Sequence, residues 1–102
     1  MDNIVNRTYT IAEIKSIVSP IAKSHGVAKV YLFGSYARGE ATGNSDIDLR
    51  IDSGKITTLF GLGGFYSDLD ESLKKPIDIV TEDSMSEKFY NAIKDEEIII
   101  YG

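Results

Sequence analysis

The sequence of 102 residues contains no cysteine and a single histidine, His25. The absence of cysteine excludes a disulfide framework and a thiolate metal site, and it fits a reducing compartment. Long apolar runs are also missing, since the longest aliphatic run near either end covers only residues 98–100. Residues 1–10 lack the basic start and the apolar stretch of a signal peptide. We therefore expect a cytoplasmic protein without a membrane segment.

Basic residues are in short supply, with 11 Lys and Arg against 16 Asp and Glu and a net charge of −5. Tight nonspecific binding of nucleic acid relies on neutralisation of phosphates by Lys and Arg, so no direct nucleic-acid partner is expected. A hydrophobic content of 42% and a charged content of 26% are ordinary for a globular protein. The length predicts one domain over residues 1–102, with a thin core that a partner protein would help to cover.

The most informative stretch of the chain covers residues 30–49. An apolar run over residues 30–33 predicts a strand that ends at Gly34. Ser35 then begins a short helical turn, which Gly39 ends. A polar loop over residues 42–45 leads into a second predicted strand over residues 46–52. The stretch is therefore predicted to place a tight glycine turn beside the start of a strand.

Two aspartates, Asp46 and Asp48, lie at the start of that second strand. Side chains alternate along a strand, so both carboxylates should project from one face, about 6.5–7 Å apart at Cα. Neighbouring carboxylates repel each other, and oxygen-rich pairs of this kind suit Mg²⁺. Gly34 and Ser35 would present backbone N–H groups at a helix start, where anions bind. The combination suggests a site for a nucleoside triphosphate and its Mg²⁺.

The rest of the chain alternates between helical and strand patterns. Thr10 and Glu13 form a predicted capping box for a helix that ends at Gly26, with Pro20 producing a kink. A second long helix is predicted over residues 56–73. Gly61, Gly63 and Gly64 interrupt it, and they should either start the helix late or allow close approach of another segment.

The last third of the chain predicts a strand, a helix and a strand. Residues 76–80 read as a strand that carries Asp78 among apolar neighbours. Ser84 or Ser86 would cap a last helix with Phe89, Tyr90 and Ile93 on its apolar side. Residues 98–101 are strand-like, and a bare edge there would invite pairing with another chain.

The ordered motif of Gly34-Ser35, Ala37-Arg38-Gly39 and Asp46-Ile47-Asp48 resembles the signature of the DNA polymerase β-like nucleotidyltransferase superfamily. The small size resembles its minimal nucleotidyltransferase (MNT) branch, which includes antitoxins paired with HEPN-domain toxins. The resemblance covers roughly residues 10–101. It implies an α/β fold, in which a mixed sheet has helices packed on one face and the carboxylate site on the other.

The resemblance also implies a set of functional residues. Asp78 matches the third carboxylate of the superfamily, so Asp46, Asp48 and Asp78 become the expected catalytic and metal-binding residues, holding two Mg²⁺ or Mn²⁺ ions. Gly34, Ser35 and Arg38 become the expected nucleotide-binding residues. Arg50 continues the Asp46 and Asp48 face. It could contact the nucleotide or the acceptor, or pair with Asp52.

The activity that the resemblance implies is transfer of AMP from ATP to a tyrosine hydroxyl of a partner HEPN toxin, within a hetero-oligomer. One alternative is a binding module that neutralises its partner stoichiometrically and does not depend on catalysis. Another is nucleotidyl transfer to a small molecule. His25 is expected to be a surface residue at a helix end, and Tyr36 a packing residue.

Overall fold

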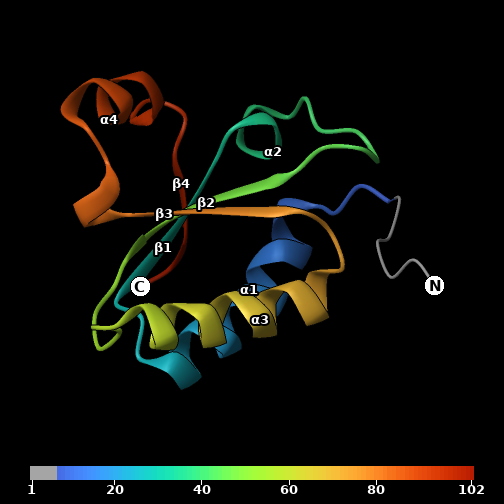
Figure 1. Cartoon of the computed structure of the whole chain (residues 1–102). Coiled ribbons are helices and arrows are strands. Elements are labelled where there is room, and N and C mark those ends of the chain that lie inside the picture. The colour runs from blue at the N-terminus through green and yellow to red at the C-terminus, as the bar shows by residue number, and fades with distance from the viewer. Residues whose placement is uncertain (1–6) are drawn as a thin grey trace.

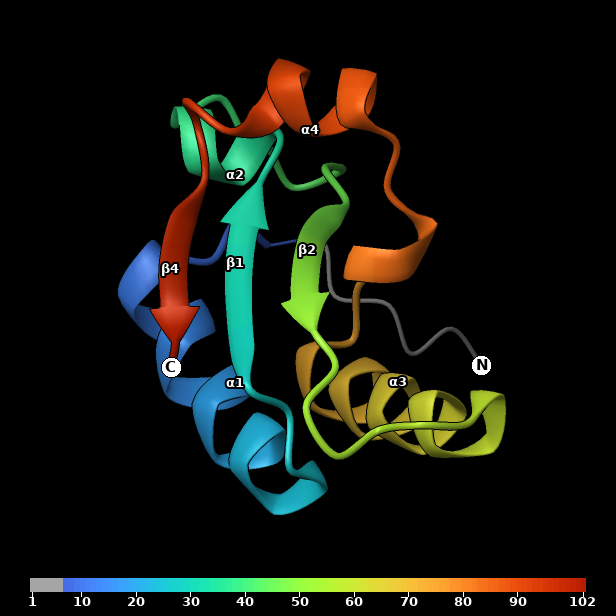
Figure 2. The same cartoon turned by 90° about the vertical axis from the view of Figure 1, so that its left-hand side faces the viewer.

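The computed structural model describes residues 7–102, which form a four-stranded sheet with the strand order β3-β2-β1-β4. Strand β1 (Lys29–Phe33) is antiparallel to both of its neighbours, β2 (Ile47–Asp52) and β4 (Ile98–Tyr101). Strand β3 (Ile77–Thr81) pairs with β2 in parallel. Figure 2 shows the alternating directions of β4, β1 and β2. The sheet is therefore mixed, as predicted, and β3 and β4 are its edges.

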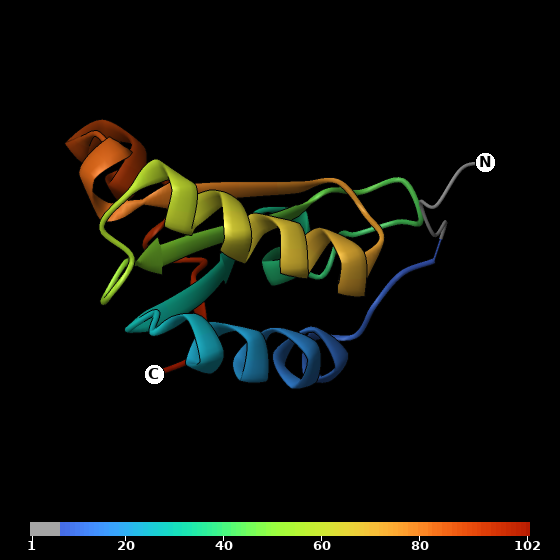
Figure 3. The same ribbon diagram turned by 60° about the horizontal axis from the view of Figure 1, so that its bottom comes forward.

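The two long helices, α1 (Ile11–His25) and α3 (Leu59–Leu73), lie side by side on one face of the sheet (Figures 1 and 3). The short helix α2 (Ser35–Arg38) and the last helix α4 (Glu87–Ile93) lie at the upper end of the strands in Figure 2, and Tyr36 of α2 joins the core. A 3₁₀ turn, η1 (Glu82–Ser84), follows β3. The core fills the layer between the sheet and α1 and α3, where apolar side chains of both helices and of the central strands are buried.

Local capping signals set the ends of α1 as predicted. The Glu13 N–H donates to Thr10 Oγ1 (3.0 Å), and the Thr10 N–H donates to Glu13 Oε1 (2.8 Å). The helix continues through Pro20 and ends at Gly26, whose φ of 74° is left-handed. At its last turn, His25 contacts Asp68 (2.7 Å from Nε2 to Oδ2) and packs edge-on against Phe65. This contact joins the ends of α1 and α3.

The prediction for the glycines of α3 was wrong in one respect. The helix begins later than residue 56 because the side chain of Thr58 caps it by accepting from the Gly61 N–H (3.0 Å). All three glycines lie inside the helix and do not delay its start. A Cβ atom added at Gly63 would meet nothing within 4 Å. Intrachain packing therefore does not require glycine at Gly63.

The later elements confirm the predicted order with small shifts. Strand β3 begins at Ile77, directly after Pro76. Ser86 is the residue that caps α4, whereas Ser84 ends the 3₁₀ turn. Within residues 7–102, no helix has both the length and the apolar character that crossing a membrane requires.

Candidate active site

The site is built around the turn that joins β1 to α2. Gly34 has a φ of 77°, in the region that favours glycine. A Cβ atom at this position would also lie 2.1 Å from Asp48 Oδ2. Both its conformation and its closeness to Asp48 therefore require glycine. After one turn of helix, Gly39 (φ 73°) ends α2, so Ser35 and Arg38 are held next to the start of β2.

Register places two of the predicted carboxylates together. Asp48 of β2 and Asp78 of β3 are partners in the parallel ladder, and the antiparallel ladder puts Phe33 opposite Asp48 on the other side. Asp46 lies directly before β2 and is exposed, as is Asp78, whereas Asp48 is partly buried between its neighbours. The buried Lys75 donates to the carbonyl of Gly43 (2.7 Å), which ties down the loop that leads to Asp46.

The carboxyl group of Asp48 carries the electrostatic cost of this arrangement. Burial raises its pKa from the ordinary 3.8 to about 6, with further contributions from the charge of Asp78, a hydrogen bond to Asp78 and the charge of Asp46. The positive charge of Arg38 acts in the opposite direction but does not outweigh them. The folded protein therefore disfavours the ionised form of the Asp48 carboxyl group.

This donor set fits a hard divalent cation. Mg²⁺ is usually bound through one or two carboxylates together with phosphates of a substrate. The raised pKa of Asp48 shows that burial, and after it the neighbouring carboxylates, disfavour the ionised form, which a bound cation would stabilise. In the part of the chain that the structure describes, no three acidic or histidine side chains are gathered closely enough to enclose an ion. A cation bound to the Asp48 and Asp78 pair would therefore need further oxygen ligands, such as those of a bound nucleotide.

Arg38 lies at the end of α2 with two carboxylate partners. Its Nε donates to Glu40 Oε1 (2.9 Å), and its Nη1 lies 3.3 Å from both carboxylate oxygens of Glu96. These hydrogen bonds raise the pKa of the guanidinium above its ordinary value, so Arg38 stays charged. Glu96 also accepts from the Gly34 N–H (2.6 Å). The predicted phosphate-binding groups Gly34 and Arg38 therefore share one acidic partner.

Arg50, whose role the sequence left open, is buried in an ion pair. Its Nη2 donates to Glu97 Oε1 (3.0 Å), its Nε contacts the other oxygen of Glu97, and its Nη1 lies 3.3 Å from Asp52 Oδ1. The guanidinium also lies 4.0 Å from the ring centroid of Tyr31. These bonds, with Glu97 as the largest cause, raise the pKa of Arg50. Of the alternatives considered, pairing with Asp52 is observed, but the main partner is Glu97.

Sequence reasoning missed both Glu96 and Glu97 as parts of this region. They are consecutive residues in the segment between α4 and β4, and each holds one arginine of the site face. The only sequence signal was the acidic pair directly before the apolar run of β4.

Tyr36 is buried with 3% exposure, in agreement with its predicted packing role.

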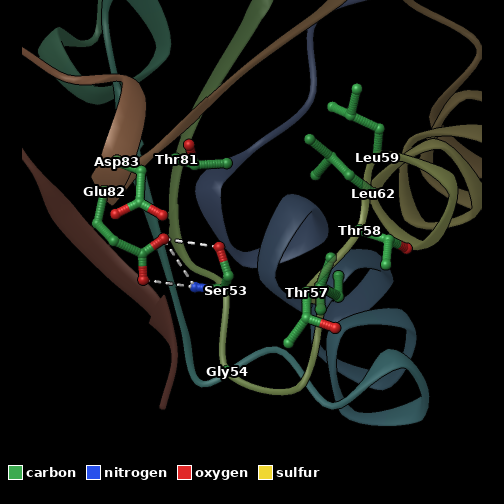
Figure 4. A pocket seen from close by; sticks show the side chains of 10 residues that line it. Ser53, Gly54, Thr57, Thr58, Leu59, Leu62, Thr81, Glu82 and Asp83 are labelled. Atoms are coloured by element: carbon green, nitrogen blue, oxygen red, sulfur yellow. Dashed lines mark hydrogen bonds between the residues drawn. The ribbon is translucent and has the colours of Figure 1, made fainter.

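A separate pocket of about 510 Å³ lies away from the carboxylates (Figure 4). It is lined by residues that follow the ends of β2 and β3, among them Ser53 and Glu82, which are hydrogen-bonded to each other. Because Asp48 and Asp78 lie near the beginnings of these strands, this pocket is at the opposite end of the sheet. None of its lining residues belongs to the predicted site.

A carboxylate pair beside a glycine-serine turn on a small mixed sheet matches the arrangement that the resemblance to nucleotidyltransferases implies. Comparison with known proteins supports this class. Residues 15–102 match the family model described as polymerase beta, nucleotidyltransferase. A Methanocaldococcus jannaschii protein named as a protein adenylyltransferase is 36% identical over 88 residues, which cover 86% of this chain and 95% of that protein.

A further relative and two solved structures are also similar to this chain. The protein adenylyltransferase MntA of Thermococcus cleftensis is 30% identical over 95 residues, covering 89% of this chain and 96% of that protein. A solved structure described as a minimal nucleotidyltransferase superposes with a TM-score of 0.75 at 28% identity, covering 88% of this chain and 95% of the other. The fold is also shared by a complex described as a tri-AMPylated Shewanella oneidensis HEPN toxin with its MNT antitoxin, with a TM-score of 0.69, 17% identity and coverage of 91% and 73%.

The chain belongs to the polymerase beta nucleotidyltransferase family, among its minimal nucleotidyltransferases. It is therefore a nucleotidyltransferase, in a family whose enzymes depend on metal ions. The membership of the nucleotidyltransferase family that the motif indicated, and the predicted α/β fold with a mixed sheet, are confirmed.

Proposed function

We propose that this protein transfers AMP from ATP to a tyrosine hydroxyl of a HEPN-type toxin and thereby acts as its antitoxin. The observation that carries the proposal is the pairing of Asp48 with Asp78 beside the Gly34 turn. The relatives named as protein adenylyltransferases match nearly the whole chain, which favours a protein acceptor over a small molecule. Asp46 and Asp78 are exposed, so an acceptor on another protein can approach them.

The residue roles follow from position. Asp46, Asp48 and Asp78 would hold Mg²⁺, which, when bound, neutralises phosphate charge and lowers the pKa of the acceptor hydroxyl. Ser35, at the start of α2, and Arg38, one turn later, would bind the β- and γ-phosphates. Gly34 allows this turn to lie against Asp48. These contacts would orient ATP with its α-phosphate near the carboxylates. The proposed location is the cytoplasm, which supplies the ATP.

In the transfer step, the tyrosine oxygen forms a bond to the α-phosphorus while the bond from this phosphorus to the oxygen that bridges to the β-phosphate breaks. The hydroxyl proton passes to the carboxylate of Asp78, and pyrophosphate leaves. The reacting oxygen must come within about 3–3.5 Å of the phosphorus. A docked protein partner holds a tyrosine at such a distance reproducibly, so the proposal includes a stable hetero-oligomer.

The direct test is co-expression with a HEPN protein encoded beside this chain, followed by intact mass spectrometry of that partner. The expected result is a mass increment of one or more AMP groups that maps to tyrosine. The increment should disappear with the double variant Asp46→Asn/Asp48→Asn. Glu87→Gln is a matched control, because Glu87 is exposed on α4 and should leave transfer unchanged. A partner that is neutralised but keeps its unmodified mass would refute transfer.

A further inference from the structure

We infer that Glu96 is a positioning residue of the nucleotide site. Its carboxylate holds Arg38 and the Gly34 turn in the arrangement that binds the triphosphate. The inference rests on the proposed function and assigns a role to a residue outside the family motif. Glu96 reaches the site from the segment between α4 and β4, and the chain separates it from Arg38 by 58 residues. It contacts both the Gly34 N–H, in the turn between β1 and α2, and the guanidinium of Arg38, at the end of α2.

The carboxylate of Glu96 makes every contact that this role requires. Its Oε2 accepts from the Gly34 N–H at 2.6 Å, and both of its oxygens lie 3.3 Å from Arg38 Nη1. Its side chain is 21% exposed, against 65% for Glu40, the other carboxylate that pairs with Arg38. The Glu40 contact is the shorter of the two (2.9 Å against 3.3 Å), but the more buried Glu96 carboxylate is less screened by water. Glu96 is also the one of the two that joins Arg38 to the Gly34 turn.

The backbone around Glu96 is itself fixed. The Glu96 N–H donates to the carbonyl of Ile93 at the end of α4 (3.0 Å), and the Glu97 N–H donates to the same carbonyl (3.2 Å). The next side chain, Glu97, is anchored by the buried Arg50. A functional geometry is most accurate when its supporting residues are locked in this way. Glu96 is therefore presented to the site on a rigid turn.

Arg38 keeps a donor free for a phosphate while Glu96 holds it. Glu40 takes Nε and Glu96 takes Nη1, and within residues 7–102 Nη2 makes no hydrogen bond. Guanidinium groups bind phosphate oxygens through N–H groups in a fixed plane, so fixing two of the nitrogens directs the third. The two glutamates thus orient Arg38 without consuming its ability to bind the triphosphate.

Glu96 also acts on the carboxylates through Gly34. The Gly34 Cα lies so close to Asp48 that an added Cβ would be 2.1 Å from Asp48 Oδ2. A shift of this turn would therefore change the space available to the Asp48 carboxylate. By fixing the Gly34 N–H, Glu96 limits that shift.

Two substitutions separate these effects. In Glu96→Gln, the amide oxygen can still accept from Gly34, but the charge that pairs with Arg38 is gone. We expect KM for ATP to rise about tenfold while kcat stays within about twofold, because phosphate binding is weakened without moving the carboxylates. Glu96→Ala also releases the Gly34 turn, so kcat should fall as well, by roughly tenfold or more. Glu87→Gln removes an exposed charge of α4 and should change neither constant.

A double-mutant cycle identifies Arg38 as the intermediary. In an Arg38→Gln background, Glu96→Gln should raise KM by less than about twofold, because the partner it acts through is already missing. Additive effects of the two substitutions would overturn the inference. A lower KM in Glu96→Gln would overturn it too, since Glu96 would then compete with the phosphates.

Stability and activity measurements separate the remaining outcomes. A loss of thermal stability in Glu96→Gln and Glu96→Ala with wild-type KM and kcat would show a purely structural role and refute the inference alone. A wild-type protein that transfers no AMP in the presence of ATP, Mg²⁺ and its partner would refute the proposed function. Measuring wild type beside each variant therefore distinguishes the two failures.

Discussion

Replacing Asp48 with asparagine should stabilise the metal-free protein while abolishing AMP transfer. Asp48 is partly buried beside Asp78, with Asp46 close enough for its charge to act on it. Asparagine is nearly the same size, carries no charge, and its amide can donate to the Asp78 carboxylate. The substitution thus removes a partly buried charge and its repulsion by the neighbouring aspartates from the folded state. At the same time it removes a ligand of the proposed metal site.

The magnitude follows from the pKa of Asp48, which the folded state raises from 3.8 to about 6. A raised carboxyl pKa means that the folded protein disfavours the ionised form, so the penalty is absent below about pH 4, grows up to about pH 6 and is complete above it. Full conversion of that change would give about 3 kcal/mol. Because Asp48 is only partly buried and water screens its neighbours, we expect about 1–2 kcal/mol.

The assay is denaturant and thermal unfolding of wild type and Asp48→Asn with EDTA, at pH 8 and at pH 4. At pH 8 the variant should be more stable and its Tm higher by roughly 5–15 °C, whereas at pH 4 the two proteins should be equal. Asp83→Asn, at an exposed position of η1, is the control. Mg²⁺ should raise the Tm of wild type more than that of Asp48→Asn. A variant that is less stable at pH 8, or a difference that does not depend on pH, would refute the reasoning.

Three further substitutions test the surroundings of the site. Glu97→Gln leaves the buried Arg50 without its main charged partner, so urea denaturation should show a loss of about 3 kcal/mol; a loss below about 1 kcal/mol would contradict the buried pair. Gly34→Ala should abolish transfer in the mass assay, since its Cβ would lie 2.1 Å from Asp48 Oδ2 at a φ of 77°; wild-type transfer would show that the turn can move. Gly63→Ala should raise the unfolding free energy by about 1 kcal/mol, because this helical position has nothing within 4 Å of an added Cβ. A destabilised Gly63→Ala would indicate a contact that the packing does not account for.

Elements with local signals were predicted well. The capping box at Thr10, the stop at Gly26, and the turn from Gly34 to Gly39 depend on residues within a few positions of each other, and the structure confirms them. The start of α3 was misplaced because the pattern of apolar residues says little about which of several polar residues forms the cap. Thr58 is the residue that caps α3, since its hydroxyl oxygen accepts a hydrogen bond from the Gly61 N–H.

The long-range part of the site could not be predicted. Glu96 and Glu97 are separated from Arg38 and Arg50 by 58 and 47 residues, and they meet only because β4 pairs with β1. The apolar alternation of a strand identifies a strand but not its neighbour in the sheet. For that reason the sequence left Arg50 with several possible partners and gave Glu96 no role.

Because of these two ion pairs, neither Arg38 nor Arg50 forms an ion pair with Asp46, Asp48 or Asp78 in the described part of the chain. Arg38 and Arg50 are the arginines of this face, and each is paired with a glutamate of the α4–β4 segment. Arg38 still acts on Asp48, but burial and the neighbouring aspartates outweigh it and keep the pKa raised. Had either arginine been free to pair with Asp48 or Asp78, the metal-free protein would be more stable, and a cation would have less repulsion to relieve. Because Glu96 and Glu97 hold both arginines, we expect the aspartates to need an external cation to balance their charge. Burial adds to the penalty on the ionised form of Asp48, so removing its charge should increase stability at the cost of function.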